Sequence, residues 1–150
     1  DGKRKAKTAL CISLAEIRPA AEQGQAFWKQ KAKTAYAEVA KIATGKLAAE
    51  ALYYDAYFKN KEGKYEASNA SVQKLAKDFS GYKYYGAKGL VLMAKNFYAL
   101  KDAYQPTYIL ESVTTNFTDY PDVVEEAKAE LAVIKAAESK TNSSVETDGN

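Results

Sequence analysis

One seven-residue pattern occurs three times in the chain, and it constrains the fold more than any other feature. Residues 39–45 (VAKIATG), 75–81 (LAKDFSG) and 113–119 (VTTNFTD) each read as two helical turns followed by Thr or Ser and a chain-reversing Gly or Asp. The copies are offset by 36 and 38 residues. A fixed period of about 20–50 residues is typical of stacked repeats. The chain is therefore expected to be a series of similar helical units.

Apolar residues recur at helical spacing, and no stretch shows the strict alternation of a strand. In residues 26–43, for example, Ala32, Tyr36, Val39 and Ala43 form one apolar stripe. The same pattern predicts helices at residues 3–17, 26–43, 48–61, 65–79, 84–100, 103–117 and 121–138. Residues 139–150 have almost no apolar content and are expected to form a disordered tail. We predict an all-α fold.

Composition excludes several classes of function. The net charge of +3, from 22 Lys+Arg against 19 Asp+Glu, is small and dispersed, so no nucleic-acid surface is predicted. No apolar run approaches the ~20 residues that span a bilayer, so no transmembrane segment is predicted. The chain has no His, which excludes His-based catalytic triads and His-ligated metals. Its single Cys, Cys11, cannot form an internal disulfide and is expected to be buried. We expect neither cofactor nor metal.

The repeat can be followed inward from the three stretches. A small or turn residue recurs at Ala32, Ser68 and Pro106, a bulky one at Tyr36, Val72 and Leu110, and another apolar one at Val39, Leu75 and Val113. In the preceding helices Leu52 matches Leu90, and Ala56 matches Ala94. Small residues let antiparallel helices approach, and large ones fill the groove against the next pair. One such pair cannot bury its apolar side alone, so neighbours must stack.

These residues resemble the tetratricopeptide repeat (TPR) family. The matching positions are Leu52, Ala56, Gly63, Tyr65, Ser68, Val72 and Leu75 in one unit, and Leu90, Ala94, Lys101, Asp102, Pro106, Leu110 and Val113 in the next. Departures are Ser68 and Pro106 in place of Ala, Lys101 in place of Gly, Leu75 and Val113 in place of a smaller residue, and units longer than the usual ~34 residues. The resemblance implies an α-α superhelix of about three units, at residues 3–45, 46–81 and 82–119. With a capping helix at 121–138, these would form a single domain, residues 1–138.

Segments 31–42, 48–57 and 104–134 are further similar to the C-terminal part of large cell-envelope TPR proteins of Gram-negative bacteria, which are BamD-like in style. That similarity implies a scaffold on the periplasmic side of the bacterial cell envelope, associated with envelope complexes such as those of outer-membrane assembly. Without it, a cytoplasmic location is the alternative.

Aromatic residues crowd the first helices of two units, and some do not fit the apolar stripes. Tyr54, Phe58 and Tyr85 lie off the stripes, and exposed aromatic residues are favoured at binding hot spots. The resemblance implies that first helices line a concave peptide-binding surface. Lys59, Lys88 and Lys95, on the same helices, would suit an acidic or carboxylate ligand. For most of these aromatic residues the favoured interpretation is nevertheless core, since a stripe at helical spacing is first a packing signal.

Three functional hypotheses follow. The favoured one is a non-enzymatic protein–protein interaction scaffold that binds a peptide or partner helix in a groove of Tyr54, Phe58, Tyr85, Lys59, Lys88 and Lys95. The second is a structural C-terminal cap of a longer envelope TPR solenoid, whose N-terminal repeats would carry the binding. The chain has no initiator Met and is expected to be a fragment or a processed piece. The third and least favoured is an enzyme using Tyr or carboxylate chemistry. No catalytic residue is assigned, because the Glu125, Glu126 and Glu130 cluster is better interpreted as a solvated helix face.

Overall fold

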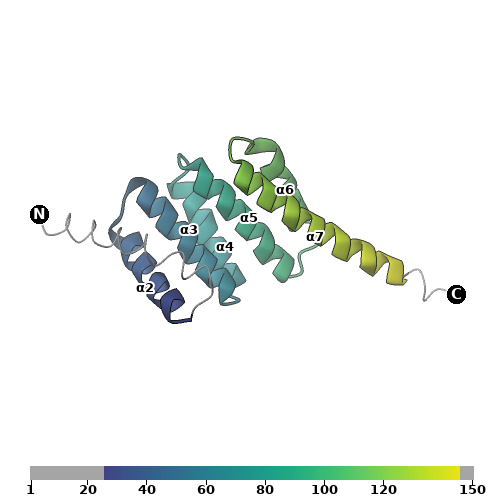
Figure 1. The fold of residues 1–150 in the computed structure, drawn as a ribbon, viewed down its shortest axis with the longest axis horizontal. Helices are drawn as coiled ribbons and strands as arrows, with labels where there is room; N and C mark the ends of the chain where they lie inside the picture. The colour runs from purple at the N-terminus through teal and green to yellow at the C-terminus, as the bar shows by residue number, and fades with distance from the viewer. Residues whose placement is uncertain (1–25, 146–150) are drawn as a thin grey trace, which may run out of the picture. The chain divides into compact units, whose positions relative to one another are not determined.

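The computed structural model describes residues 26–145, and every regular element within that range is a helix. The helices are α2 (Ala26–Ile42), α3 (Gly45–Lys61), α4 (Tyr65–Asp78), α5 (Lys83–Ala99), α6 (Gln105–Asn116) and α7 (Pro121–Val145) (Figure 1). The all-α prediction is confirmed for this range, and five of the six expected helices within it occur close to their expected bounds. The expected helix at residues 3–17, with Cys11, lies outside the described residues.

The last helix differs from the expectation. α7 continues to Val145, although disorder was expected from residue 139. The prediction rested on low apolar content, which tells whether a segment packs but not whether a helix can be extended. Extension adds one hydrogen bond per residue fixed and is far less costly than nucleation. The Ser139 and Thr141 hydroxyls also donate to the carbonyls of Ala136 and Ala137, both at 3.0 Å. Residues 146–150 lie outside the described range.

The structure divides into two compact units, Asp1–Gly86 and Ala87–Asn150, with the boundary inside α5. A single domain over residues 1–138 was expected. In helical repeats each element contacts mainly its neighbours, so contacts remain local along the chain. In the first unit α3 packs against both α2 and α4, and in the second α6 packs against α7 (Figure 1).

The core of the first unit alternates small and large side chains. Ala49, Ala51 and Ala56 of α3 are completely buried, which lets the neighbouring helices approach closely. Ser68 of α4 is also completely buried, and its hydroxyl donates to the Ala56 carbonyl at 2.7 Å. Tyr36, Phe58, Val39, Val72 and Leu75 are fully buried larger side chains that fill the remaining space.

Equivalent positions in the second unit have the same burial. Four pairs of residues 38 positions apart are buried in both units. They are Ala56, Ser68, Val72 and Leu75 in the first unit and Ala94, Pro106, Leu110 and Val113 in the second. Val123, Ala127 and Ile134 of α7 complete this core. The small and bulky positions read from the sequence are therefore confirmed as packing positions in both units.

The turns repeat as well as the core. After α3 and after α5, a residue with positive φ donates to the carbonyl three residues earlier, and the next residue donates to the carbonyl five residues earlier, which is the Schellman arrangement. The bonds are Gly63 N to Asn60 O (2.9 Å) and Lys64 N to Lys59 O (2.9 Å) after α3, and Lys101 N to Tyr98 O (3.0 Å) and Asp102 N to Phe97 O (3.0 Å) after α5. Gly63 has φ +75° and Lys101 has φ +65°.

The seven-residue pattern that repeats in the sequence is also a structural repeat. The residues directly after α2, α4 and α6 are Ala43, Phe79 and Phe117, and their amides donate to the carbonyls of Val39, Leu75 and Val113 respectively. Gly45, the last residue of the first copy, has φ +65° and so reverses the chain where a side chain would be strained. Local backbone structure therefore follows the period of 36–38 residues.

Candidate binding surface

The aromatic residues assigned to a groove from sequence are buried, so the exposure expected of them is wrong. Tyr54, Phe58 and Tyr85 are only 5%, 2% and 8% exposed. Tyr54 stacks on Tyr36 of α2, with ring centroids 4.6 Å apart and planes 17° from parallel. None of these three rings offers a face to a partner.

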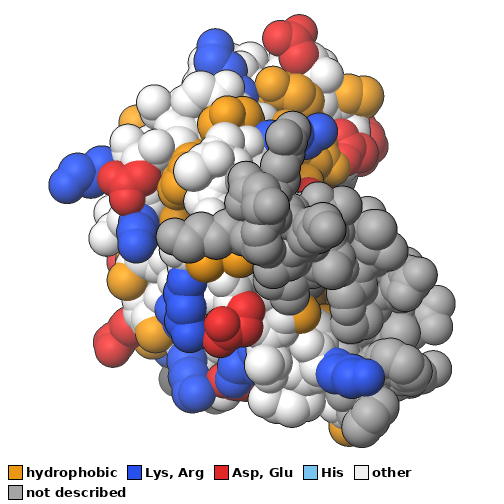
Figure 2. All heavy atoms as spheres, turned by 90° about the vertical axis from the view of Figure 1, so that its left-hand side faces the viewer, with side chains coloured by type: hydrophobic (Ala, Val, Ile, Leu, Met, Phe, Trp, Pro, Cys, Tyr) orange, Lys and Arg blue, Asp and Glu red, His pale blue; other side chains and the backbone are white. Residues whose placement is uncertain are grey.

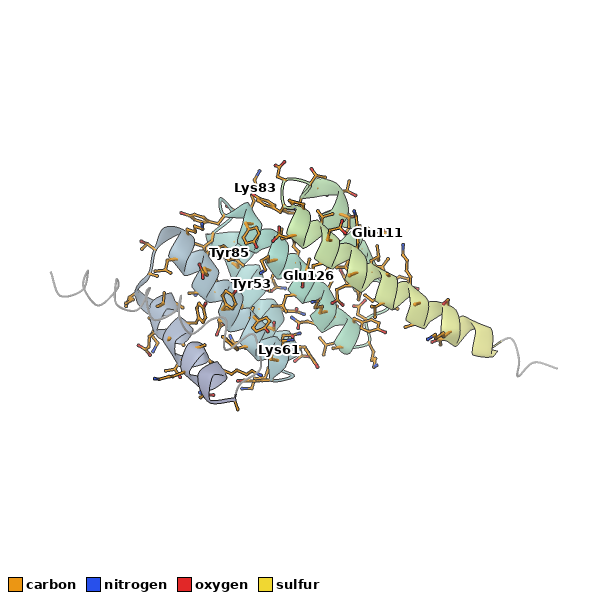
Figure 3. The ribbon with its side chains drawn as sticks, in the orientation of Figure 1. Tyr53, Lys61, Lys83, Tyr85, Glu111 and Glu126 are labelled. Carbon is orange, nitrogen blue, oxygen red and sulfur yellow. The ribbon has the colours of Figure 1, made fainter. Side chains whose placement is uncertain are left out.

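The cause is that α3 is covered on two sides. A helix between two neighbours has no single buried stripe, so residues off one stripe still enter the other contact. Tyr85 comes from the first turn of α5, where its hydroxyl donates to the Glu50 carboxylate of α3 at 2.9 Å. Its ring lies 6.1 Å from that of Tyr53, and Figure 3 labels both side chains.

The lysines predicted to bind a ligand also interact with other residues of the protein. Lys59 donates to the Asp55 carboxylate at 2.7 Å and to the Ser71 hydroxyl at 2.8 Å. Lys88 is half-buried. Tyr54, Phe58, Lys59 and Tyr85 belong to the first unit, whereas Lys88 and Lys95 belong to the second. The six predicted residues are therefore not assembled as one accessible ligand site within either unit.

Lys95 stabilises the second unit by forming ion pairs with two carboxylates. Its ammonium lies 2.8 Å from the Glu126 carboxylate and 3.0 Å from that of Glu130 (Figure 3 labels Glu126). Burial lowers the pKa of Lys95, but the hydrogen bonds and charges of the two carboxylates outweigh it and raise the pKa above its ordinary value. On the same helix Glu125 pairs with Lys128 at 2.9 Å. These glutamates thus act in ion pairs along a helix.

Among the described residues, the two most exposed large hydrophobic side chains are tyrosines of the second unit. Tyr104, directly before α6, is 85% exposed, and Tyr108, one turn later, is 74% exposed. The buried positions of α6 are Pro106, Leu110 and Val113. At about 100° per residue, the two tyrosines lie on the opposite side of the helix from these positions. Their exposure therefore follows from how α6 packs.

Two shallow depressions flank Tyr104. The first, of about 650 Å³, is lined by Ala103, Tyr104, Gln105, Thr107, Tyr108, Glu111 and Glu138. We call these seven residues the tyrosine surface. The second depression, of about 660 Å³, shares Ala103, Tyr104 and Glu138 with it and adds Tyr98 and Lys101 among others. The two depressions meet at the edge formed by Tyr104 and Glu138.

Asp102 holds the backbone at the start of this surface. Its carboxylate accepts hydrogen bonds from the backbone amides of Tyr104 (3.0 Å) and Gln105 (2.9 Å). These are donors that a helix N-terminus otherwise leaves without a partner. Pro106 follows in the first turn, where its fixed φ suits the helix. The Tyr104 main chain is therefore fixed while its ring is in solvent.

The tyrosine surface carries one uncompensated carboxylate. Glu111, labelled in Figure 3, pairs with Lys135 at 3.0 Å. The carboxylate of Glu138 has no hydrogen bond or ion pair with any other described residue. No Lys or Arg lines the first depression within the described part of the chain. The local charge is therefore negative although the chain as a whole is positive.

The face shown in Figure 2 differs from the tyrosine surface in that it carries charges of both signs. Among the side chains drawn in colour there, Lys side chains are intermixed with Asp and Glu, and hydrophobic groups are scattered between them. Such mixed charge is typical of a solvated surface.

No protein-family profile, curated protein or solved structure matches this chain. Within residues 26–145 no helix is long and apolar enough to cross a membrane. The same range contains no group of three or more His, Cys, Asp or Glu side chains arranged to hold a metal ion.

Proposed function

We propose that this chain is a non-enzymatic, TPR-like interaction module that binds a protein or peptide partner through the tyrosine surface. The observation that carries the proposal is the pair of tyrosines one helical turn apart, both largely in solvent, on a helix whose other side is packed. This surface replaces the groove expected from the sequence, because the aromatic residues of that groove are buried.

Physical chemistry supports such a role for these tyrosines. An exposed aromatic ring leaves a large apolar area in water, and covering that area with a partner is favourable. Tyr also has few rotatable bonds and a hydroxyl that forms hydrogen bonds, which is why it is enriched at interface hot spots. The anchoring of Tyr104 by Asp102 further lowers the entropy lost when a partner binds.

A second candidate function is a structural C-terminal cap of a longer envelope TPR solenoid. α7 favours it, because the exposed positions of this 25-residue helix are largely polar or Ala. Terminal repeats need such a polar outer face for solubility. The similarity to envelope TPR proteins supports a location on the periplasmic side of the cell envelope for either function, with the cytoplasm as the alternative.

The test is affinity capture from a Gram-negative envelope extract. The bait is the whole chain, compared with the double variant Tyr104→Ala/Tyr108→Ala. Ile42→Ala is the matched control. Ile42 lies in the first unit and is 51% exposed, so its replacement removes an exposed apolar group at another place on the chain. Circular dichroism confirms that each bait remains helical.

We expect the wild-type chain and the control to retain the same partner and the double variant to lose it. If the double variant captures that partner equally well, the tyrosine surface is not the binding site. If none of the three baits captures a specific partner, the structural cap is favoured instead.

A further inference from the structure

We propose that the tyrosine surface recognises an Arg side chain in an extended segment of the partner. The guanidinium would lie on the ring of Tyr104 or Tyr108 and pair with the Glu138 carboxylate. This inference rests on the proposed function and adds the chemical class of the ligand. It is the opposite of the acidic ligand that the sequence suggested for the lysine-bearing helices.

Charge complementarity is the first argument. Within the first depression Glu111 pairs with Lys135, but no described residue forms an ion pair with Glu138. Bringing a cation to an unpaired carboxylate next to apolar area is favourable, whereas bringing a second carboxylate is repulsive. The surface therefore selects a basic residue over an acidic one.

The neighbouring rings are the second argument. A cation within about 6 Å of an aromatic ring centre is attracted by the negative face of the ring. The protein already contains such a contact, since the Lys61 ammonium lies 5.2 Å from the centre of the Tyr57 ring. Arg suits the surface better than Lys, because its planar guanidinium can stack on a ring and also form two parallel hydrogen bonds to one carboxylate.

The shape of the site indicates an extended segment. Both depressions are open and shallow, and they meet at Tyr104 and Glu138. An Arg held at that edge would leave the residues on either side of it over the two depressions, where they cover Ala103 and the tyrosine rings. Lys101 lines only the second depression, so the cation is expected on the side of Tyr108.

The probes are three acetylated and amidated peptides that differ at one residue. The first is Gly-Ser-Leu-Arg-Leu-Ser-Gly, the second has citrulline, the neutral isostere of Arg, and the third has Glu. Each is titrated into the ¹⁵N-labelled whole chain, and chemical-shift changes of the backbone amides are followed by NMR. The variants are Tyr104→Ala, Glu138→Gln and the matched control Glu125→Gln, whose carboxylate is exposed on the same helix but already pairs with Lys128.

We expect the Arg peptide to shift amides at 103–108 and 137–141, with the citrulline and Glu peptides binding at least fivefold more weakly. Glu138→Gln and Tyr104→Ala should each raise the Kd of the Arg peptide about fivefold, which is the size of one exposed ion-pair or cation–π contact. Glu125→Gln should leave the Kd unchanged. Because the ion pair is exposed, the Kd should also rise with salt.

The inference is overturned if Arg and citrulline peptides bind equally, if the Glu peptide binds best, or if the shifts lie elsewhere. It is also overturned if sedimentation velocity shows a dimer that Tyr104→Ala abolishes, since a second copy would then occupy the surface. If the Arg peptide fails while partner capture still depends on the tyrosines, the interaction function stands and only the ligand class is wrong. If both fail, the proposed function is wrong as well.

Discussion

The reciprocal replacements Lys101→Gly and Gly63→Ala should change stability in opposite directions by similar amounts. The two residues occupy equivalent turns and have positive φ, +65° for Lys101 and +75° for Gly63. A side chain in this left-handed region costs about 1–2 kcal/mol. The greater freedom of Gly in the unfolded chain offsets about 0.4–1 kcal/mol of that cost. The net change should be about 1 kcal/mol, stabilising for Lys101→Gly and destabilising for Gly63→Ala.

The structure makes this a clean backbone comparison. A Cβ added at Gly63 would meet no heavy atom within 4 Å, so Gly63→Ala introduces no clash. The Lys101 side chain is exposed and forms no hydrogen bond or ion pair with another described residue. Lys101→Ala is the matched control, because it removes the same side chain and keeps the strained φ.

The assay is urea unfolding followed by far-ultraviolet circular dichroism, with the slope of unfolding free energy against urea compared between variants. We expect Lys101→Gly to raise the midpoint, Gly63→Ala to lower it, and Lys101→Ala to stay within about 0.5 kcal/mol of wild type. If Lys101→Ala stabilised the chain as much as Lys101→Gly, the gain would come from the side chain. The argument from backbone strain would then be refuted.

Three further predictions concern the first unit. Gly45→Ala should destabilise the folded chain by about 1–2 kcal/mol, because Gly45 has φ +65° and an added Cβ would lie 3.1 Å from the Tyr82 hydroxyl. Gly81→Ala is the control and should be nearly neutral in the same urea assay, because a Cβ there meets open space. Hydrogen bonds from two lysines lower the pKa of Glu62 from 4.5 to about 2. The ionised carboxylate therefore stabilises the fold above pH 4.5, and this contribution is lost as the pH falls towards 2. Glu62→Gln should remove that part of the acid unfolding transition in a pH titration. Tyr54→Ala should cost about 3 kcal/mol or more and lower the thermal midpoint, since the ring is buried; an unchanged midpoint would contradict its place in the core.

The repeat could be predicted from the sequence because the residues that recur in it act through local structure. Small positions such as Ala56 and Ser68 and helix-ending glycines such as Gly45 and Gly63 act through their immediate surroundings. The structure bears out their burial and their backbone angles. Lys101 was noted as a departure from the Gly of the TPR pattern, and it still adopts the positive φ that the position requires.

The aromatic residues could not be assigned correctly because burial depends on how many neighbours a helix has. Tyr54 and Phe58 were placed off the apolar stripes, and the sequence does not say that α3 packs on both α2 and α4. A stripe argument counts one contact surface per helix. Tyr85 was misassigned for a related reason, since its hydroxyl reaches Glu50 on α3.

The tyrosine surface had a signal in the sequence that was not used. Tyr104, Tyr108 and Glu111 recur at i, i+4 and i+7, the same spacing as the buried Pro106, Leu110 and Val113 but on the other side of α6. Aromatic residues in the polar stripe of an otherwise well-packed helix indicate a binding surface. The contribution of Glu138 could not have been found this way, because it comes from α7, where a disordered tail was expected to begin one residue later.

The claim that the accessible aromatic surface lies at Tyr104 and Tyr108, and not at Tyr54 and Tyr85, can be tested by one measurement. The folded chain is treated with N-acetylimidazole, and the rate at which each tyrosine is acetylated is followed by peptide mass spectrometry. The account predicts fast modification of Tyr104 and Tyr108, with Tyr54 and Tyr85 modified only after unfolding. Modification of Tyr54 or Tyr85 as fast as that of Tyr104 in the folded chain would contradict it.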